Sequence, residues 1–295
     1  VALGLARLRG DAAAVASAER RLRALGVRVG AAAGAGLLRA VAVPVGDAVR
    51  VQALGGFRVL RGGVPVRVEE WQSKKARDLL KVLVARRGRA TARELLAELL
   101  WPGEDPDKVG NRLSVALSVA RTVLDPERKL PPDRYLIADK TTVRLGDLPV
   151  DVEEFLAAAA EGLAQAGDPV AEGDSAATDL LAAAEAGYAG DFLEEDPYED
   201  WAAPLREEAR AGYLAVARAL AERAAAAGEH DLAVRYHLRV LERDSYDEAA
   251  HLGLVRTLTA AGRHGEARRR YRFYVERMDE IGVETEPFPA GPPAA

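Results

Sequence analysis

The middle of the chain changes from an alternating to a helical hydrophobic pattern. Residues 51–68, VQALGGFRVLRGGVPVRV, alternate apolar and polar side chains around two glycine pairs, which predicts strands joined by turns. Residues 72–88 then place apolar side chains three and four positions apart, which is typical of an amphipathic helix that ends at Gly88. The residues expected to face the core from this helix are Leu79, Leu80, Leu83 and Val84.

Two more helices and a hairpin are predicted before residue 150. TARELLAELLW begins with Thr91 and has Glu94 three positions later, which is the spacing of a capping box. A third helix is expected to start near Asp105-Pro106, where a capping residue precedes proline, and to run to Leu124. YLIADKTTVRL alternates around Asp139-Lys140 and predicts a hairpin. The resulting order, β–β–α–α–α–β–β, is typical of a winged helix-turn-helix.

From residue 151 the pattern is helical, over 151–166, 175–190 and 200–227, and then it repeats. The pairs that lie 34 residues apart are Gly228 and Gly262, Ala233 and Ala267, Leu220 and Leu254, and Leu241 and Val275. A 34-residue period of paired helices, with small residues at fixed places, is the tetratricopeptide pattern. Each pair must stack on its neighbours to bury its apolar face.

These patterns predict a mainly α chain with a small β component. We expect a helical remnant and Gly/Ala-rich linker over 1–49, a winged helix-turn-helix over 50–150, a tetratricopeptide-like all-α domain over 151–284, and a Pro-rich disordered tail over 285–295. The sequence starts at Val1 rather than at methionine, so a fragment of a longer protein and a complete chain with a leader both stay open.

The net charge of −5 conceals a division along the chain. Residues 1–49 carry a net charge of +4, residues 50–150 carry +7, and residues 151–295 carry −16. A basic module followed by an acidic one indicates a polyanionic partner for the first and a different role for the second. The alternative is a drift of charge without functional meaning.

The composition argues against several classes of function. With no cysteine, the chain has no disulfide, thiolate metal site or cysteine nucleophile, and a cytoplasmic location is expected. We find no long apolar run and no signal-peptide pattern, so we expect neither secretion nor a membrane partner. The acidic run Glu194-Glu195-Asp196 has the charge to bind a cation, but a solvated loop is the simpler interpretation.

An enzyme is the first rival class, and little in the sequence favours it. No phosphate-binding glycine loop or Ser/His/Asp arrangement is visible, so no catalytic residue, cofactor or metal is expected. The histidines all lie in the repeats as ordinary helix positions, and they are His230, His237, His251 and His264.

The third helix has two distinct faces. At 100° per residue, an apolar stripe is formed by Leu113, Leu117, Ala120 and Leu124. The opposite face holds Asn111, Val115, Ser118 and Thr122, with Arg112 and Val119 on one flank and Ser114 and Arg121 on the other. This short, uncharged face suits a helix in the DNA major groove, because small side chains approach base edges while arginines reach phosphates or guanine. An ordinary exposed face would normally carry more Glu and Lys.

Two other clusters are candidates for contact with DNA. The first helix opens with Gln72, Ser73, Lys74 and Lys75, where free N–H groups and two lysines suit a phosphate. A plain N-cap with solvated lysines would have the same sequence. Lys140, Thr141 and Thr142 occupy the expected tip of the hairpin, where contact with the minor groove or the DNA backbone is expected.

Several segments, taken in order, resemble one family. They are LGGFRVLRGG, KKARDLLKVLVARRG, RELLAELLWP, NRLSVALSVARTVL, VDVEEF, GDFLEEDPYEDW and IGVETEP. Over roughly residues 50–287 the chain resembles the Streptomyces antibiotic regulatory proteins. In that family an OmpR-type winged helix precedes a bacterial transcriptional activator domain built from tetratricopeptide-like helices.

The resemblance implies a transcriptional regulator, usually an activator. Such a protein binds direct repeats in double-stranded DNA near promoters, as a homodimer, and contacts RNA polymerase. The binding positions it implies are those of the third helix and the hairpin tip. A scaffold stays open as a second class, in which the repeats bind a peptide and the winged helix contacts protein.

Overall fold

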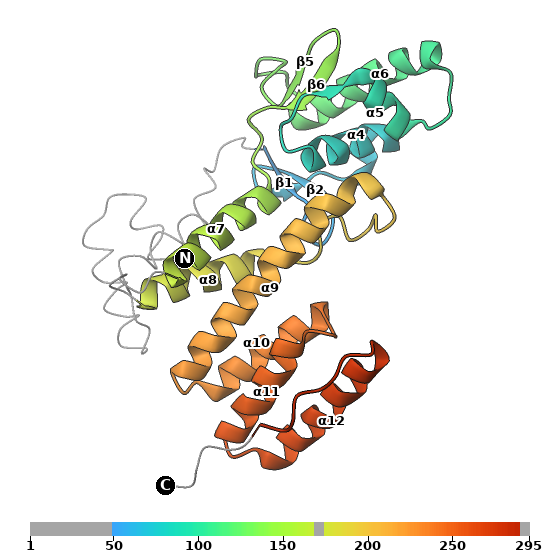
Figure 1. Ribbon diagram of the computed structural model, residues 1–295. Helices are drawn as coiled ribbons and strands as arrows, with labels where there is room; N and C mark the ends of the chain where they lie inside the picture. Colours follow the sequence, from blue (N-terminus) through green and yellow to red (C-terminus); the bar gives the residue numbers. More distant parts are fainter. Residues whose placement is uncertain (1–48, 168–173, 290–295) are drawn as a thin grey trace, which may run out of the picture. The chain divides into compact units, whose positions relative to one another are not determined.

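The computed structural model describes residues 49–167 and 174–289 (Figure 1). The helix expected over 1–27 and the linker that follows it lie outside the described residues. The chain divides into two compact units that are not consecutive halves. The first joins Val1–Glu154 to Ala189–Arg206, and the second joins Phe155–Tyr188 to Glu207–Ala295. A first domain that ended at residue 150, as expected from the sequence, would therefore lack the segment Ala189–Arg206, which returns to the first unit.

The first unit begins with an antiparallel sheet of β1 (Val49–Gln52), β2 (Arg58–Arg61) and β3 (Val64–Pro65), in that spatial order. Val51 pairs with Val59, and both are buried. The turn between β2 and β3 has φ of 57° at Gly62 and 81° at Gly63, a conformation that glycine adopts without strain. The predicted strand–turn–strand pattern is confirmed here.

The helices of the first unit are α4 (Lys74–Ala85), α5 (Arg93–Leu100) and α6 (Pro106–Leu124). A short 3-10 helix, η1 (Val68–Trp71), leads into α4, whose first turn is capped by Ser73. The four predicted core residues of α4 are all buried, as expected from their spacing. Phe57 and Trp71 close the core between the sheet and α4, with ring centroids 6.2 Å apart.

The predicted capping box at Thr91 is wrong. Thr91 lies in β4 (Thr91–Ala92), which pairs with β6 (Thr142–Leu145), and β6 also pairs with β5 (Leu136–Ala138). The strand pairing keeps the backbone extended through Ala92, so α5 starts later and Ala92 takes the cap position without a side-chain bond. The Thr91 hydroxyl donates to the Arg89 carbonyl at 3.1 Å instead.

The segment Ala189–Arg206 covers part of the first unit. Its backbone pairs with the loop after β1, where the Leu193 N–H donates to the Ala53 carbonyl at 2.8 Å. Phe192 and Leu193 are fully buried. A side chain on Gly190 would place its Cβ 2.8 Å from the Gly55 Cα, so this close approach requires glycine.

Acidic side chains of the same segment bind cations of α4. Lys81 is only 4% exposed, and its ammonium contacts the carboxylates of Glu195, at 2.6 Å, and Asp196. Arg77 also pairs with Glu195, at 2.8 Å. Two carboxylates of the acidic run at 194–196 thus hold a buried lysine. Among the described residues, no group of three or more His, Asp or Glu side chains has the arrangement of a metal site.

The second unit is all-α. Its helices are α7 (Asp151–Ala166), α8 (Asp174–Gly187), α9 (Ala203–Ala226), α10 (His230–Arg243), α11 (Glu248–Ala260) and α12 (His264–Glu280). The first residues of α7 and of α9 belong to the first unit. A 3-10 turn, η2 (Asp200–Ala202), precedes α9 and belongs to the first unit. Tyr188 packs between Phe155 and Tyr213, with ring centroids 5.1 and 4.3 Å apart. Among the described residues, no helix is long and apolar enough to cross a membrane.

The 34-residue period is confirmed as two helix pairs. Gly228 ends α9 with φ of 75°, and Gly262 ends α11 with φ of 72°. Ala233 in α10 and Ala267 in α12 are both fully buried, because a small side chain lets the paired helices approach closely. The predicted fold class, mainly α with small sheets, is therefore correct.

The expectation of a disordered tail is wrong for residues 285–289. This stretch lies without helix or strand, but it contacts the last two helices. Phe288 packs on Tyr271 with ring centroids 5.2 Å apart, and this burial of an aromatic ring opposes disorder. Residues 290–295 lie outside the described part.

Candidate nucleic-acid interface

The buried face of α6 is set by its apolar stripe. The predicted residues Leu113, Leu117, Ala120 and Leu124 are between 0 and 5% exposed. Val109, Ala116 and Val123 are buried with them, so the stripe is wider than the sequence spacing suggested. A broad apolar stripe fixes the rotation of the helix on α4 and α5, and it leaves one narrow face outward.

The outward face of α6 consists of short side chains. Asn111, Val115, Ser118 and Thr122 are all exposed, and Val115 reaches 56%. The Thr122 hydroxyl donates to the Ser118 carbonyl at 3.1 Å and therefore keeps its acceptor lone pairs free for an incoming donor. The predicted exposure of this face is confirmed, and its contact with bases stays a prediction.

The side chains on the two flanks of α6 differ in the bonds that they form with the rest of the chain. Arg112 pairs with Glu104 and is about half exposed, while Val119 is half-buried. Arg121 donates to Asp133 at 2.9 Å and to the Leu136 carbonyl at 2.8 Å, so it ties α6 to the segment before β5. Contact between Arg121 and DNA would have to compete with these bonds.

The tip of the hairpin between β5 and β6 is internally bonded. The backbone N–H and the hydroxyl of Thr141 donate to Asp139 at 2.7 and 3.0 Å, and those of Thr142 donate at 2.7 and 2.9 Å. The backbone N–H of Thr142, then that of Thr141, and then the two hydroxyls lower the pKa of Asp139 to about 2. These bonds fix the tip around an ionised carboxylate, and Lys140 is exposed at it.

Arg93, at the start of α5, joins the tip to α6, and sequence reasoning missed it. Its backbone N–H donates to the Thr141 carbonyl at 2.9 Å, and its guanidinium donates to the Ser114 hydroxyl at 2.9 Å. A cation in the first turn of a helix is disfavoured by the helix dipole. That mismatch was the available signal that Arg93 has a role outside α5.

Lys74 and Lys75 lie on a different element. They occupy the first turn of α4, where the Ser73 hydroxyl already accepts from the Ala76 N–H at 3.3 Å. Lys74 is exposed and Lys75 is half-buried. Within the described residues, no hydrogen bond or ion pair ties either lysine to α6 or to the hairpin. The structure thus joins the α6 face and the hairpin tip, and it does not join the lysines to them.

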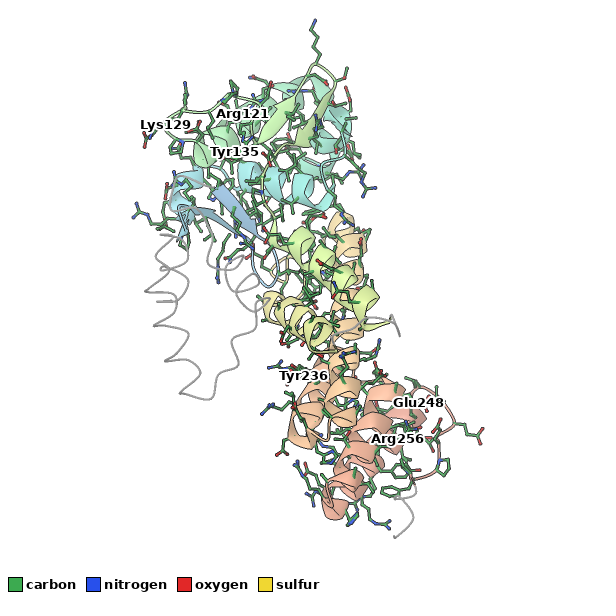
Figure 2. The ribbon with its side chains drawn as sticks, turned by 90° about the vertical axis from the view of Figure 1, so that its left-hand side faces the viewer. Arg121, Lys129, Tyr135, Tyr236, Glu248 and Arg256 are labelled. Carbon is green, nitrogen blue, oxygen red and sulfur yellow. The ribbon has the colours of Figure 1, made fainter. Side chains whose placement is uncertain are left out.

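A hollow of about 390 Å³ lies beside the C-terminal end of α6. It is lined by Ser118, Arg121 and Thr122 from the helix and by Arg128, Pro131 and Tyr135 from the following loop. Arg121 and Tyr135 are labelled in this part of Figure 2. Arg128 is exposed and extends the polar surface beyond the residues named from the sequence.

Residues 150–288 match the family model of the bacterial transcriptional activator domain. The matched region holds α7 to α12 and excludes the strands and helices that form the candidate interface. No curated protein matches the chain.

One solved structure is similar over most of the chain. It is Mycobacterium tuberculosis EmbR in complex with a low affinity phosphopeptide, with a TM-score of 0.68 and 22% sequence identity. The similarity covers 81% of this chain and 62% of the EmbR chain. At this identity the likeness shows a shared fold. The family match agrees with the activator-domain part of the resemblance drawn from the sequence, and the solved structure agrees with the expected fold class.

Proposed function

We propose that the chain is a sequence-specific DNA-binding regulator of transcription that inserts α6 into the major groove. The observation that carries the proposal is the outward face of α6, which presents four short, uncharged side chains beside a hairpin tip bonded to the same surface through Arg93. Short side chains approach base edges closely, and the neighbouring cations reach phosphates.

The proposal gives each side chain a role. Val115 contacts a thymine methyl group, and Ser118 and Thr122 hydrogen-bond to base edges, which either hydroxyl can do with any base. Asn111, Ser114 and Val119 complete the surface in the groove. Arg112 and Arg121 contact phosphate or guanine, and Lys74 and Lys75 contact phosphate only. Lys140, Thr141 and Thr142 contact the minor groove or the DNA backbone, and we add Arg93 as a phosphate contact.

The match to an activator domain supports the sign of regulation that we propose. We infer that the regulator is an activator that binds direct repeats as a homodimer and contacts RNA polymerase through its helical unit. The strongly acidic character of residues 151–295 disfavours contact of that unit with DNA and leaves it available for protein.

Selection of bound DNA from a random pool tests the proposal. Thr122→Ala and Val115→Ala are each expected to change the selected sequence at one position, at about 1–3 kcal/mol per lost base contact. Thr259→Ala is a matched control, because its hydroxyl also donates to the carbonyl four residues earlier, at 2.8 Å, but on α11.

An unchanged selected sequence in both α6 variants would show that α6 does not contact the bases. Failure of the wild-type chain to retain any duplex in a mobility-shift assay would favour the scaffold alternative instead.

A further inference from the structure

The residues after α12 fold back onto the second unit. The helix α12 ends at Glu280, Gly282 follows with φ of 69°, and the Val283 N–H donates to the Met278 carbonyl at 3.0 Å. The chain then runs beside α11 and α12 (Figure 1). We call residues 284–289, ETEPFP, the docked tail.

Two tyrosine hydroxyls hold the backbone of the docked tail at Glu286. Tyr271 donates to the Glu286 carbonyl at 2.7 Å, and the Glu286 N–H donates to the Tyr274 oxygen at 2.9 Å. Tyr274 in turn donates to Glu248 at 2.6 Å, on α11. Burial, and then the bond to Glu248, raise the pKa of Tyr274 to about 12, so its hydroxyl stays protonated at neutral pH. These contacts bind a main chain of any sequence.

Phe288 supplies the side-chain selectivity of the docked tail. Its ring meets Tyr271 edge-on, and the Arg268 guanidinium lies 5.1 Å from its centroid. The ring also packs on a buried cluster from α10, α11 and α12, which is formed by Val234, Leu254, Val255, Leu258 and Ala267. An aromatic ring between an apolar floor and a cation gains both burial and cation–π attraction.

The sequence of the docked tail is already suited to binding as a peptide. Pro287 and Pro289 flank Phe288, and proline restricts both its own φ and the residue before it. Little conformational entropy is then lost on docking, which is the basis of recognition of Pro-rich segments by aromatic surfaces. The Glu286 carboxylate lies 3.6 Å from Arg256, but both are well exposed, so this pair contributes little.

We propose that the surface made by Tyr271, Tyr274, Arg268 and the cluster under Phe288 is a peptide-binding site. Its ligand is a protein segment in which an acidic residue and a proline precede an aromatic residue followed by proline. The chain's own docked tail fills the site as a tethered ligand. A connection of only a few residues gives it an effective concentration of at least millimolar, so a partner must displace it. This site is independent of the DNA contact proposed above.

Fluorescence anisotropy with a labelled peptide of residues 283–290, VETEPFPA, tests the proposal on the full chain. Phe288→Ala weakens the docked tail, and the variant is expected to bind the peptide about ten-fold more tightly than the wild-type chain. Adding Tyr271→Phe, which removes only the hydroxyl at Glu286, is expected to weaken that binding again. The peptide VETEPAPA is expected not to bind.

Phe273→Ala is the matched control on α12. Phe273 is 39% exposed, and its ring lies 4.8 Å from the Arg277 guanidinium and 6.0 Å from the His251 ring. When it is added to the Phe288→Ala chain, Phe273→Ala is expected to leave the affinity for the peptide unchanged. If Phe288→Ala reduces helicity, the double variant Pro287→Gly, Pro289→Gly loosens the tail while keeping the aromatic ring, and it is expected to increase peptide uptake.

Equal peptide affinity of the wild-type and loosened chains would overturn the proposal and leave the docked tail a structural cap. A wild-type dimer that dissociates in the Phe288→Ala variant, seen by size-exclusion chromatography, would assign the site to the tail of a second copy and would also overturn it.

Discussion

Lys81 and Lys140 belong to the same unit, but Lys81 is buried and paired with two carboxylates, whereas Lys140 is exposed at a hairpin tip. The covering segment Ala189–Arg206 brings six acidic side chains and one basic side chain into the unit that we propose binds DNA. The excess of +7 in residues 50–150 is therefore not all available to a polyanion. Part of it stabilises the fold, and the candidate interface depends on where the remaining cations lie.

The largest expected effect on stability comes from removing the ion pairs of the buried Lys81. The double variant Glu195→Gln, Asp196→Asn removes both carboxylates that contact the buried ammonium of Lys81, so the free energy of unfolding should fall by about 3–5 kcal/mol. All three tryptophans lie in the first unit, so urea unfolding followed by tryptophan fluorescence reports on it. Glu153→Gln removes a surface pair with Arg87 and should change stability by at most about 1 kcal/mol. Similar effects of the two changes would contradict the distinction between paired and exposed cations.

The second unit contains a buried neutral base instead of a buried charge. His237 packs on Gly253, and burial lowers its pKa to about 4. Because the folded pKa lies below the unfolded value of 6.5, the stabilising contribution is complete above pH 6.5 and is lost as the pH falls toward 4. The slope reaches about 1.4 kcal/mol per pH unit.

Far-UV circular dichroism measures this acid sensitivity in the helices. His237→Asn should flatten the slope between pH 6.5 and 4. His264→Gln changes an exposed histidine and should leave the slope as it is. An unaltered slope in His237→Asn would assign the acid sensitivity to other groups.

The next comparison is between Arg93, a cation at the candidate interface, and Arg77, a cation paired with Glu195 of the covering segment. Arg93→Ala should weaken binding to all DNA sequences by about 1–2 kcal/mol and reduce the salt slope by about one unit, because it removes a phosphate contact and loosens the hairpin tip. Arg77→Gln should leave the salt slope unchanged, because Arg77 faces Glu195. Titrations of one duplex with each variant at several salt concentrations measure the affinity and the salt slope.

The smallest effect is expected for Lys74. Lys74→Ala should weaken all duplexes about equally, by less than about 1 kcal/mol, and leave the selected sequence as it is. A change of selected sequence in this variant, measured by random-pool selection, would place α4 rather than α6 in the groove.

Local patterns predicted the elements whose determinants lie close together in sequence. The 34-residue spacing of Gly228 and Gly262 identified the helix pairs, and the 100° rotation of α6 identified its exposed face. The capping box at Thr91 failed because pairing with β6, about fifty residues later, decides the backbone there. The acidic run at 194–196 was recognised as a charge cluster, but its lysine partner is more than a hundred residues away, beyond any local pattern.

The return of Ala189–Arg206 to the first unit also sets an order of events during synthesis. Domains generally fold as units while the chain emerges from the ribosome, N-terminal first. Here the loop after β1 and the ammonium of Lys81 have no cover until residue 196 has been made, by which point α7 and α8 have already been synthesised. A nascent chain therefore cannot complete its proposed DNA-binding unit early. A truncation at residue 150 would stay in that unfinished state permanently.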